Sequence, residues 1–155
     1  MKATIMIGVS GSGKSTWAKK CRAESIVVSA DHYFTDQEGR YNFDPKKLGE
    51  AHGRCLREFV NTCQAGKDVL VDNTNTSVEE IAPYYAIAKA YGYEVEFVFI
   101  EFPWNHAAAE NIHNVPNEVV KGQAKRIGGM MLPVRWQMEA KRILVDRATG
   151  REQQA

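Results

Sequence analysis

Cysteine is scarce in this sequence, and no long hydrophobic run occurs in it. The three cysteines, Cys21, Cys55 and Cys63, are an odd number without metal-ligand spacing, so they indicate neither a disulfide framework nor a zinc site. Cys55 and Cys63 fall on the apolar stripe of an expected helix, which predicts buried free thiols. No apolar run approaches the ~20 residues of a membrane span, and the N-terminus lacks the pattern of a signal peptide. We therefore expect a cytoplasmic protein without a membrane partner.

Extremes of composition and overall charge are also absent. With 155 residues, 44% of them apolar and 25% charged, the chain is expected to form one globular domain over residues 1–155. The net charge of +1 hides an uneven distribution, because residues 72–118 hold eight acidic residues and one basic residue. Residues 121–151 reverse this balance, with eight basic residues against two acidic ones. This basic segment could face the phosphates of a nucleotide or a nucleic acid, or it could be a solvated helical face.

A glycine-rich stretch, GVSGSGKS at residues 8–15, carries the clearest chemical signal. It fills the pattern G-x-x-x-x-G-K-[ST] at every fixed position, follows an expected strand at residues 3–7 and opens an expected helix at residue 16. Its glycines allow backbone conformations that a Cβ would forbid, so that successive N–H groups can converge on one anion. The alternative interpretation is a glycine-rich turn with a chance lysine.

This stretch predicts that the chain binds ATP with Mg²⁺. The side chain of Lys14 can reach the outer phosphates, and the hydroxyl of Ser15 suits a magnesium ion that bridges them. The N-terminus of the following helix adds unpaired N–H donors and the positive end of its dipole. The expected ATP-binding residues are Gly8, Ser10, Gly11, Ser12, Gly13, Lys14, Ser15 and Thr16.

The rest of the chain alternates short apolar runs with helical periodicity. Strands are expected at residues 26–29, 68–72, 93–101 and 143–145, and helices at residues 45–63, 77–91, 105–113 and 116–127. Within the helix that Ser77 begins, Pro83 predicts a kink or a restart. Residues 147–155 are expected to be a frayed tail. This alternation predicts an α/β fold of three layers, with helices on both faces of a mostly parallel sheet of about five strands.

Two aspartates follow expected strands at the edge where ligands bind in such sheets. Asp72 ends an apolar run and could hold a magnesium-bound water beside Ser15, or it could be a turn residue. Asp31 could accept the proton of an attacking hydroxyl group, or it could cap a short turn. His32 is a second candidate for the same base. Tyr33 and Tyr41 could stack on a base or a sugar, or pack their own loop.

Several segments together resemble the phage-type polynucleotide 5′-hydroxyl kinase domain and its relatives, which include the P-loop domain of the NEDD4-binding protein and zeta-toxin-like kinases. The similar segments are GVSGSGKSTW (8–17), SADHYF (29–34), YNFDPKKLGEAH (41–52), VDNTN (71–75), FPW (102–104) and NIHNVP (111–116). The resemblance covers the chain to about residue 127. It implies a P-loop NTPase fold of the nucleoside-kinase type, with a helical lid at about residues 105–127.

The resemblance also assigns roles to individual residues. Asp31 lies where the family keeps its general base, and Asn73 lies where it keeps a residue that contacts the substrate phosphate or orients the base. With Asn75, Tyr33, Tyr41 and His52, Asn73 forms the expected substrate-binding set. His52 on its own is expected to be packed or half-buried on its helix.

The chain departs from the family at the lid. Glu110 precedes Asn111 where the family has an arginine, and Phe34 stands where phage-type enzymes have a basic residue, which puts recognition of a 3′-phosphate in doubt. No arginine occurs between Arg57 and Arg126. We therefore expect Arg126, or else Arg135, to supply the charge that stabilises the transferring phosphoryl group, or else turnover is weak.

The leading hypothesis is an ATP-dependent kinase that phosphorylates the 5′-hydroxyl end of DNA or RNA. A second hypothesis keeps this chemistry with a nucleoside, a hydroxymethylated DNA base or another small hydroxyl acceptor. A third is an ATP-binding module without catalysis. The resemblance also allows a virus-encoded protein that acts in the cytoplasm of its host. The sequence makes no prediction about the oligomeric state.

Overall fold

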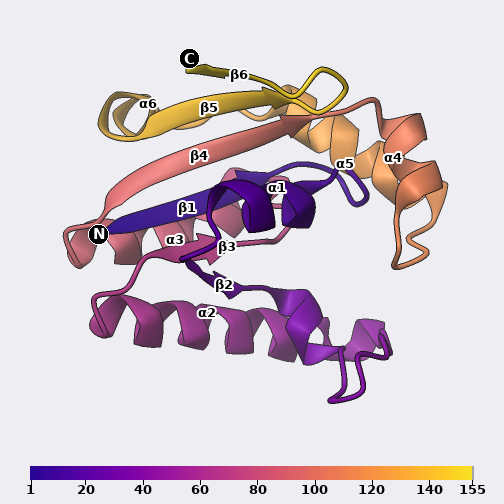
Figure 1. Ribbon diagram of the computed structural model, residues 1–155, viewed down its shortest axis with the longest axis horizontal. Helices are drawn as coiled ribbons and strands as arrows, with labels where there is room; N and C mark the ends of the chain where they lie inside the picture. The colour runs from indigo at the N-terminus through magenta and orange to yellow at the C-terminus, as the bar shows by residue number, and fades with distance from the viewer. Residues whose placement is uncertain (155) are drawn as a thin grey trace.

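A six-stranded, mostly parallel sheet forms the centre of the molecule (Figure 1). The computed structural model describes residues 1–154. The strands are β1 (Lys2–Ile7), β2 (Ile26–Val28), β3 (Val69–Val71), β4 (Glu94–Glu101), β5 (Lys141–Asp146) and β6 (Arg151–Gln154), in the order β2-β3-β1-β4-β5-β6. β1 to β5 pair in parallel, and only β6 runs antiparallel. The predicted parallel sheet of about five strands is confirmed, and β6 extends it.

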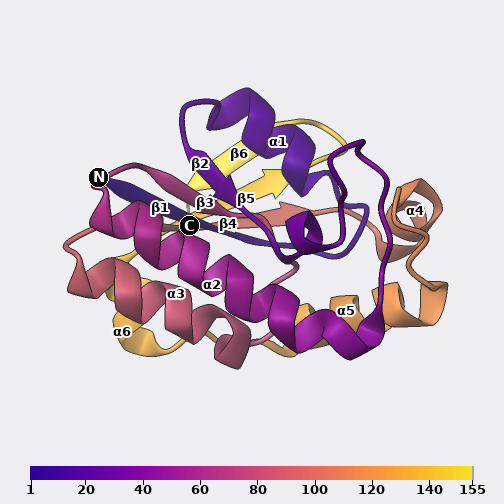
Figure 2. The same ribbon diagram turned by 90° about the horizontal axis from the view of Figure 1, so that it is seen from below.

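Helices cover both faces of this sheet, as the α/β pattern predicts. They are α1 (Lys14–Cys21), α2 (Leu48–Gln64), α3 (Val78–Ala90), α4 (Trp104–Glu110), α5 (Asn117–Gly129) and α6 (Val134–Glu139), with short 3-10 turns η1 (Ala30–Tyr33) and η2 (Pro45–Lys47). Figure 2 shows α1 on one face and α2 and α3 on the other, with α4 and α5 at the end where β1 and β4 finish. None of the helices among residues 1–154 is both long and apolar enough to cross a membrane.

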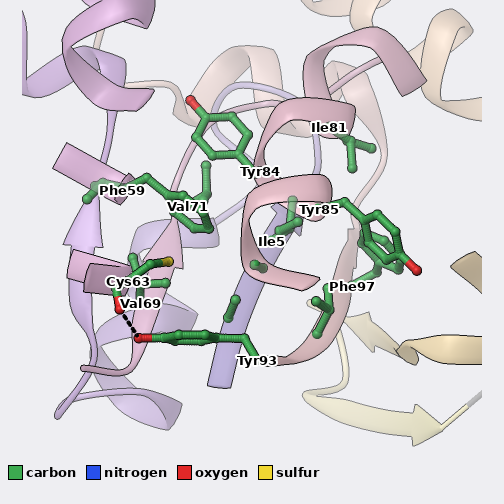
Figure 3. Packing of buried hydrophobic residues seen from close by; sticks show 14 of the residues in the cluster. Ile5, Phe59, Cys63, Val69, Val71, Ile81, Tyr84, Tyr85, Tyr93 and Phe97 are labelled. Atoms are coloured by element: carbon green, nitrogen blue, oxygen red, sulfur yellow. Dashed lines mark hydrogen bonds between the residues drawn. The ribbon is translucent and has the colours of Figure 1, made fainter. Parts of the chain in front are cut away.

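The core explains why the strand ends are held rigidly. Ile5 of β1 and Phe97 of β4 pack under Tyr85 of α3, and Phe59 of α2 packs against Tyr84 (Figure 3). On the opposite face Trp17 of α1 joins a second buried cluster with Met6, Leu70 and Val98. Because β1 is buried on both faces, its C-terminal end is a fixed platform for the loop that follows it. Trp17 is therefore a core residue.

Cysteine burial follows the prediction closely. Cys55 and Cys63 are buried and free, and Cys21 is half-buried and free. Burial raises the pKa of the Cys55 and Cys63 thiols, so both remain neutral. These thiols therefore act as packing groups.

Pro83 does not interrupt its helix, so the predicted restart does not occur. α3 runs without interruption from Val78 to Ala90. Proline removes one backbone hydrogen bond, but Ile81, Tyr84 and Tyr85 on the same helix are all buried against the sheet. Tertiary packing therefore outweighs the local penalty. The Ser77 cap is confirmed, since its side chain accepts a hydrogen bond from the Glu80 N–H.

The C-terminal segment differs most from the prediction. Residues 151–154 form β6 rather than a frayed tail, and the Glu152 carboxylate accepts a hydrogen bond of 2.9 Å from the Trp17 indole. The helix expected from Asn105 to His113 instead begins at Trp104, after Pro103, and ends at Glu110. The short helix α6 was not expected. The hydrogen bond between Trp17 and Glu152 ties the end of the described chain to α1.

Candidate active site

The loop between β1 and α1 has the backbone geometry that phosphate binding needs. Gly11 and Gly13 have φ angles of +80° and +90°, in the left-handed region that favours glycine. A Cβ on Gly8 would lie 2.8 Å from the Ser12 Oγ and 3.3 Å from the Ile100 carbonyl oxygen. Residues 8–15 can thus wrap tightly at the start of α1, where its unpaired N–H groups begin.

Lys14 is the buried cation of this loop. Its Nζ donates hydrogen bonds to the carbonyl oxygens of Gly8 (3.0 Å) and Val9 (2.9 Å). Burial lowers the pKa of Lys14, and the nearby carboxylates of Asp72 and Asp31 act in the opposite direction. An ammonium group in this setting gains strongly from any anion that enters the loop.

Ser15 and Asp72 meet at the end of β3. The Ser15 hydroxyl donates a hydrogen bond of 2.6 Å to the Asp72 Oδ2. Within residues 1–154 no three His, Cys, Asp or Glu side chains cluster as metal ligands. Mg²⁺ commonly takes one or two protein oxygens and completes its coordination with phosphate oxygens and water. The hard-oxygen pair Ser15–Asp72 fits such a role.

A phosphate cavity of about 190 Å³ lies over the loop. Its lining comprises Ser10, Gly11, Gly13, Lys14, Ser15, Thr16, Asp31, Asp72, Asn73, Thr74, Glu110, Ile112, His113 and Arg147. The cavity therefore contains six of the predicted ATP-binding residues. Gly8 and Ser12 lie behind it, where Ser12 is fully buried with no hydrogen-bond partner for its hydroxyl.

Asp31 lies at the edge of this cavity, held by two neighbours. The Tyr41 hydroxyl donates a hydrogen bond of 2.9 Å to the Asp31 Oδ1, and the His113 Nε2 lies 3.7 Å from the Asp31 Oδ2. The His113 ring packs on the Tyr41 ring with centroids 4.1 Å apart. Burial and the Asp31 charge together raise the pKa of Tyr41, so Tyr41 remains a donor to the carboxylate. His32, the alternative base, is exposed and lines neither this cavity nor the next.

A second cavity, the side cavity, of about 430 Å³, adjoins the first. The two share Ser10, Asp31, Asn73, Thr74 and His113. Its other lining residues come from η1 and the loop after it, from α2, from residues 75–80, from residues 114–116 and from α5; they include Tyr41, Phe43, Leu48, His52, Val119 and Arg126. Asp31 therefore lines the phosphate cavity as well as the partly aromatic side cavity.

Of the five predicted substrate-binding residues, all but Tyr33 line the side cavity. Tyr41 and His52 line the side cavity, although His52 is exposed and the prediction of a packed or half-buried side chain is wrong. The Tyr33 hydroxyl instead donates to Glu50 on α2, and Tyr33 lines neither cavity. Its ring packs edge-on against Phe34 within its own loop, with the ring centroids 5.3 Å apart.

The two asparagines line the side cavity but use their amides within the protein. The Asn73 Oδ1 accepts a hydrogen bond of 2.9 Å from the Ala30 N–H, which fixes the turn that carries Asp31. The Asn75 Nδ2 donates to the Met6 carbonyl oxygen at 2.7 Å, and the residue is only 1% exposed. Their side chains thus join β3 to its neighbours, a role that the sequence alone does not indicate.

The arginines do not lie where the sequence predicts them. Arg126 lines the side cavity and its Nε donates to the Thr76 Oγ1 at 2.9 Å, so it does not reach the phosphate cavity. Arg135 is exposed and pairs with Glu139. Arg147, which was expected in a frayed tail, lines the phosphate cavity instead. Its place directly after strand β5 was the available signal, because ligands bind at that edge of the sheet.

The sheet order and the phosphate loop at its carboxyl edge place the chain among the P-loop kinase-like domains. Its sequence matches a family model described as AAA domain over residues 4–127, and the chain belongs to that family. This match confirms the predicted P-loop fold.

Similar proteins also include the relatives that the sequence motifs suggested. NEDD4-binding protein 2 of Homo sapiens is 32% identical over 127 residues, which are 75% of this chain and 7% of that protein. A protein of Autographa californica nuclear polyhedrosis virus, assigned as a bifunctional polynucleotide kinase/RNA ligase, is 26% identical over 101 residues, or 57% of this chain and 15% of that protein. The chain thus spans a small part of these relatives.

A solved structure shares the fold at lower identity. The Pnkp1/Rnl/Hen1 RNA repair complex contains a chain that superposes with a TM-score of 0.67 and 18% identity, covering 82% of this chain and 44% of that one. At this identity the likeness concerns the fold alone.

Proposed function

We propose that this chain transfers the γ-phosphate of ATP to the 5′-hydroxyl group of a DNA or RNA end, with Asp31 as the general base. One observation carries the proposal: Asp31 lines both the phosphate cavity and the side cavity. A carboxylate at such a junction can meet a hydroxyl from one side and a phosphoryl group from the other. The polynucleotide kinase assignment of the viral relative supports this acceptor class.

The donor side of the reaction uses the loop and its two oxygen ligands. The N–H groups of residues 11–15 and the Lys14 ammonium hold the β- and γ-phosphates of ATP. Ser15 would hold Mg²⁺ directly, and Asp72 would hold it through a water; the ion neutralises charge on the phosphate oxygens. The buried surroundings of Lys14 strengthen its interaction with these phosphates.

On the acceptor side, Asp31 takes the proton of the attacking hydroxyl. The acceptor oxygen forms a bond to the γ-phosphorus while the bond from that phosphorus to the bridging oxygen of ADP breaks. Tyr41 occupies the Asp31 Oδ1 and so orients the carboxylate. The Asp31 Oδ2 makes no hydrogen bond to His113, whose Nε2 lies 3.7 Å away, and this oxygen would receive the proton. Asn73 supports the same geometry through the Ala30 N–H.

The lining of the side cavity suits a single nucleotide unit. Tyr41 and Phe43 offer ring faces for a base or a sugar, and Arg126 offers a cation for a phosphate. His52 adds a polar group at the exposed side. The terminal nucleotide would occupy the cavity, with the rest of the strand outside.

A second candidate is a kinase of nucleosides or of other small hydroxyl acceptors. Several segments wall the cavity, and its lining contains a single arginine, Arg126, together with the carboxylates of Asp31 and Glu80. A continuous polynucleotide normally needs a basic groove for its backbone. This observation favours a small acceptor.

A transfer assay with γ-labelled ATP and Mg²⁺ distinguishes the two candidates. The acceptor panel contains 5′-hydroxyl DNA, 5′-hydroxyl RNA, free nucleosides and hydroxymethylated DNA, with 5′-phosphorylated oligonucleotides as the matched control. The proposal predicts the highest kcat/KM with 5′-hydroxyl oligonucleotides and no transfer to the phosphorylated control. Preferential transfer to nucleosides would establish the second candidate instead.

A further inference from the structure

An arginine from the C-terminal part of the chain lies over the phosphate loop. Arg147 is in the turn between β5 and β6, and its Nη1 donates a hydrogen bond of 3.0 Å to the Gly11 carbonyl oxygen. Its Nη2 pairs with the Glu110 carboxylate at the end of α4. The guanidinium carbon lies 4.3 Å from the centroid of the Phe102 ring. Three contacts from three segments thus define where this side chain sits.

Arg147 lies against the glycine loop and lines the phosphate cavity. A Cβ on Gly13 would lie 2.8 Å from the Arg147 Nε, so the arginine lies directly against the residue that precedes Lys14. Among the residues that line the phosphate cavity, Lys14 and Arg147 are the only lysine or arginine side chains. Arg147 is therefore the second cation at the phosphate cavity, beside Lys14. Arg126 lines the side cavity instead.

We propose that Arg147 is the catalytic arginine that contacts the transferring phosphoryl group, and that Glu110 is the residue that positions it when no phosphate is present. The inference rests on the proposed phosphotransferase function. A guanidinium group donates paired hydrogen bonds to phosphate oxygens and stays charged at every relevant pH. The family match ends at residue 127, so this arginine comes from outside the matched region.

The Glu110–Arg147 pair can exchange partners. Both side chains are partly exposed, at 49% and 33%, and ion pairs in that setting are weak because solvent screens them. The multiply charged phosphates of ATP would compete well for the guanidinium. Glu110 also lines the phosphate cavity, so removing Arg147 alone leaves an unpaired carboxylate facing the phosphates. Removing both charges should therefore cost less than removing Arg147 alone.

The test compares two ligands that differ only at the γ-phosphate position. ADP with aluminium fluoride and Mg²⁺ mimics the transferring phosphoryl group, and ADP with Mg²⁺ alone does not. Binding of each is measured by calorimetry with the full chain, its Arg147→Ala and Arg147→Lys variants, and the double variant Arg147→Ala with Glu110→Ala. Arg151→Ala, in strand β6 only four positions further on, is the matched control.

Arg147→Ala should weaken binding of the aluminium fluoride complex by roughly 10²-fold, the usual cost of losing one transition-state donor, with a much smaller effect on ADP alone. The lysine variant should recover part of this loss, the double variant should bind better than Arg147→Ala, and Arg151→Ala should resemble the wild type. Thermal denaturation confirms that each variant is folded.

Several results would overturn the assignment. If Arg147→Ala lost equal affinity for both ligands, Arg147 would contact the nucleoside or the inner phosphates. If the affinity of Arg147→Ala for both ligands were unchanged, Arg147 would have no role in binding. A wild type that binds the two complexes equally would also count against it. Because the assay contains no acceptor, a failure to find an acceptor in the transfer assay would contradict the proposed function without altering the role of Arg147 that calorimetry measures.

Discussion

Two carboxylates at neighbouring strand ends have different partners, and this separates their roles. Asp31 follows β2 and contacts Tyr41 and His113, both of which belong to the side-cavity lining. Asp72 follows β3 and contacts Ser15 of the phosphate loop. Asp31 is therefore suited to proton transfer at the acceptor, and Asp72 to the magnesium ion of the donor. The roles of Asp31 as base and of Asp72 at the magnesium ion remain proposals, and the structure adds the contacts of each carboxylate.

Replacing Asp72 with asparagine tests the magnesium role. Asp72→Asn keeps the size of the side chain and removes the charge opposite Ser15, so the Mg²⁺ concentration for half-maximal transfer should rise about 10- to 100-fold, as for other groups that support a metal. Titration of transfer activity against Mg²⁺ at saturating ATP measures this shift.

Asp68→Asn is the matched control for this titration. Asp68 precedes the same strand at its opposite end, where its carboxylate accepts a hydrogen bond from the Lys2 N–H. Its replacement should leave the Mg²⁺ requirement unchanged. An unaltered Mg²⁺ requirement in Asp72→Asn would remove Asp72 from the metal site.

At the level of elements, α4 and α5 contact the phosphate loop directly. The Ala107 carbonyl oxygen of α4 would lie 2.0 Å from a Cβ on Gly11, and the Gln123 Oε1 of α5 accepts a hydrogen bond of 2.9 Å from the Ser10 N–H. We interpret these two helices as the lid that the resemblance implies for residues 105–127. In this structure α4 packs closely against Gly11, so the two helices lie beside the loop.

Gly11→Ala should disrupt this packing. The substitution adds a clash with the backbone of α4 to the cost of a left-handed φ, and we expect it to lower the free energy of unfolding by about 2–5 kcal/mol. Gly39→Ala is the control, because Gly39 has the same φ of +80° and no atom within 4 Å of its Cβ position.

Chemical denaturation of both variants separates the two costs. Gly39→Ala should lose only the backbone contribution, about 1–2 kcal/mol. Equal losses in the two variants would show that α4 does not hold its position on Gly11.

The strand β6 and the turn before it show why part of the site escaped prediction. Residues 147–154 are almost entirely polar, so neither a period of two nor an apolar run marks a strand there. What orders them is antiparallel pairing with the adjacent strand β5 and the hydrogen bond from the Trp17 indole to Glu152, and the second of these contacts joins segments far apart in the sequence. Arg147 lies in this stretch and was assigned to the expected tail, although it directly follows β5.

Across the whole molecule, the sequence predicted the elements whose signal is local. The phosphate loop, the parallel strands and the acids at their ends follow from apolar runs, turn residues and the strand-edge rule, and the structure brings Lys14, Ser15, Asp31 and Asp72 into one cavity. The side cavity could not be predicted, because its lining comes from segments far apart in the sequence. The inward-turned amide of Asn75 and the continuous helix through Pro83 likewise depend on packing partners far along the chain.

The central claim is that Asp31 joins a donor site to an acceptor site, and one measurement tests it most directly. Transfer of the labelled γ-phosphate to a 5′-hydroxyl oligonucleotide is compared between the wild type and Asp31→Asn, with MgATP affinity measured alongside. Loss of the base should lower kcat by about 10²- to 10⁴-fold and leave ATP binding unchanged. Undiminished transfer by Asp31→Asn, or no transfer by a wild type that binds ATP well, would contradict the account.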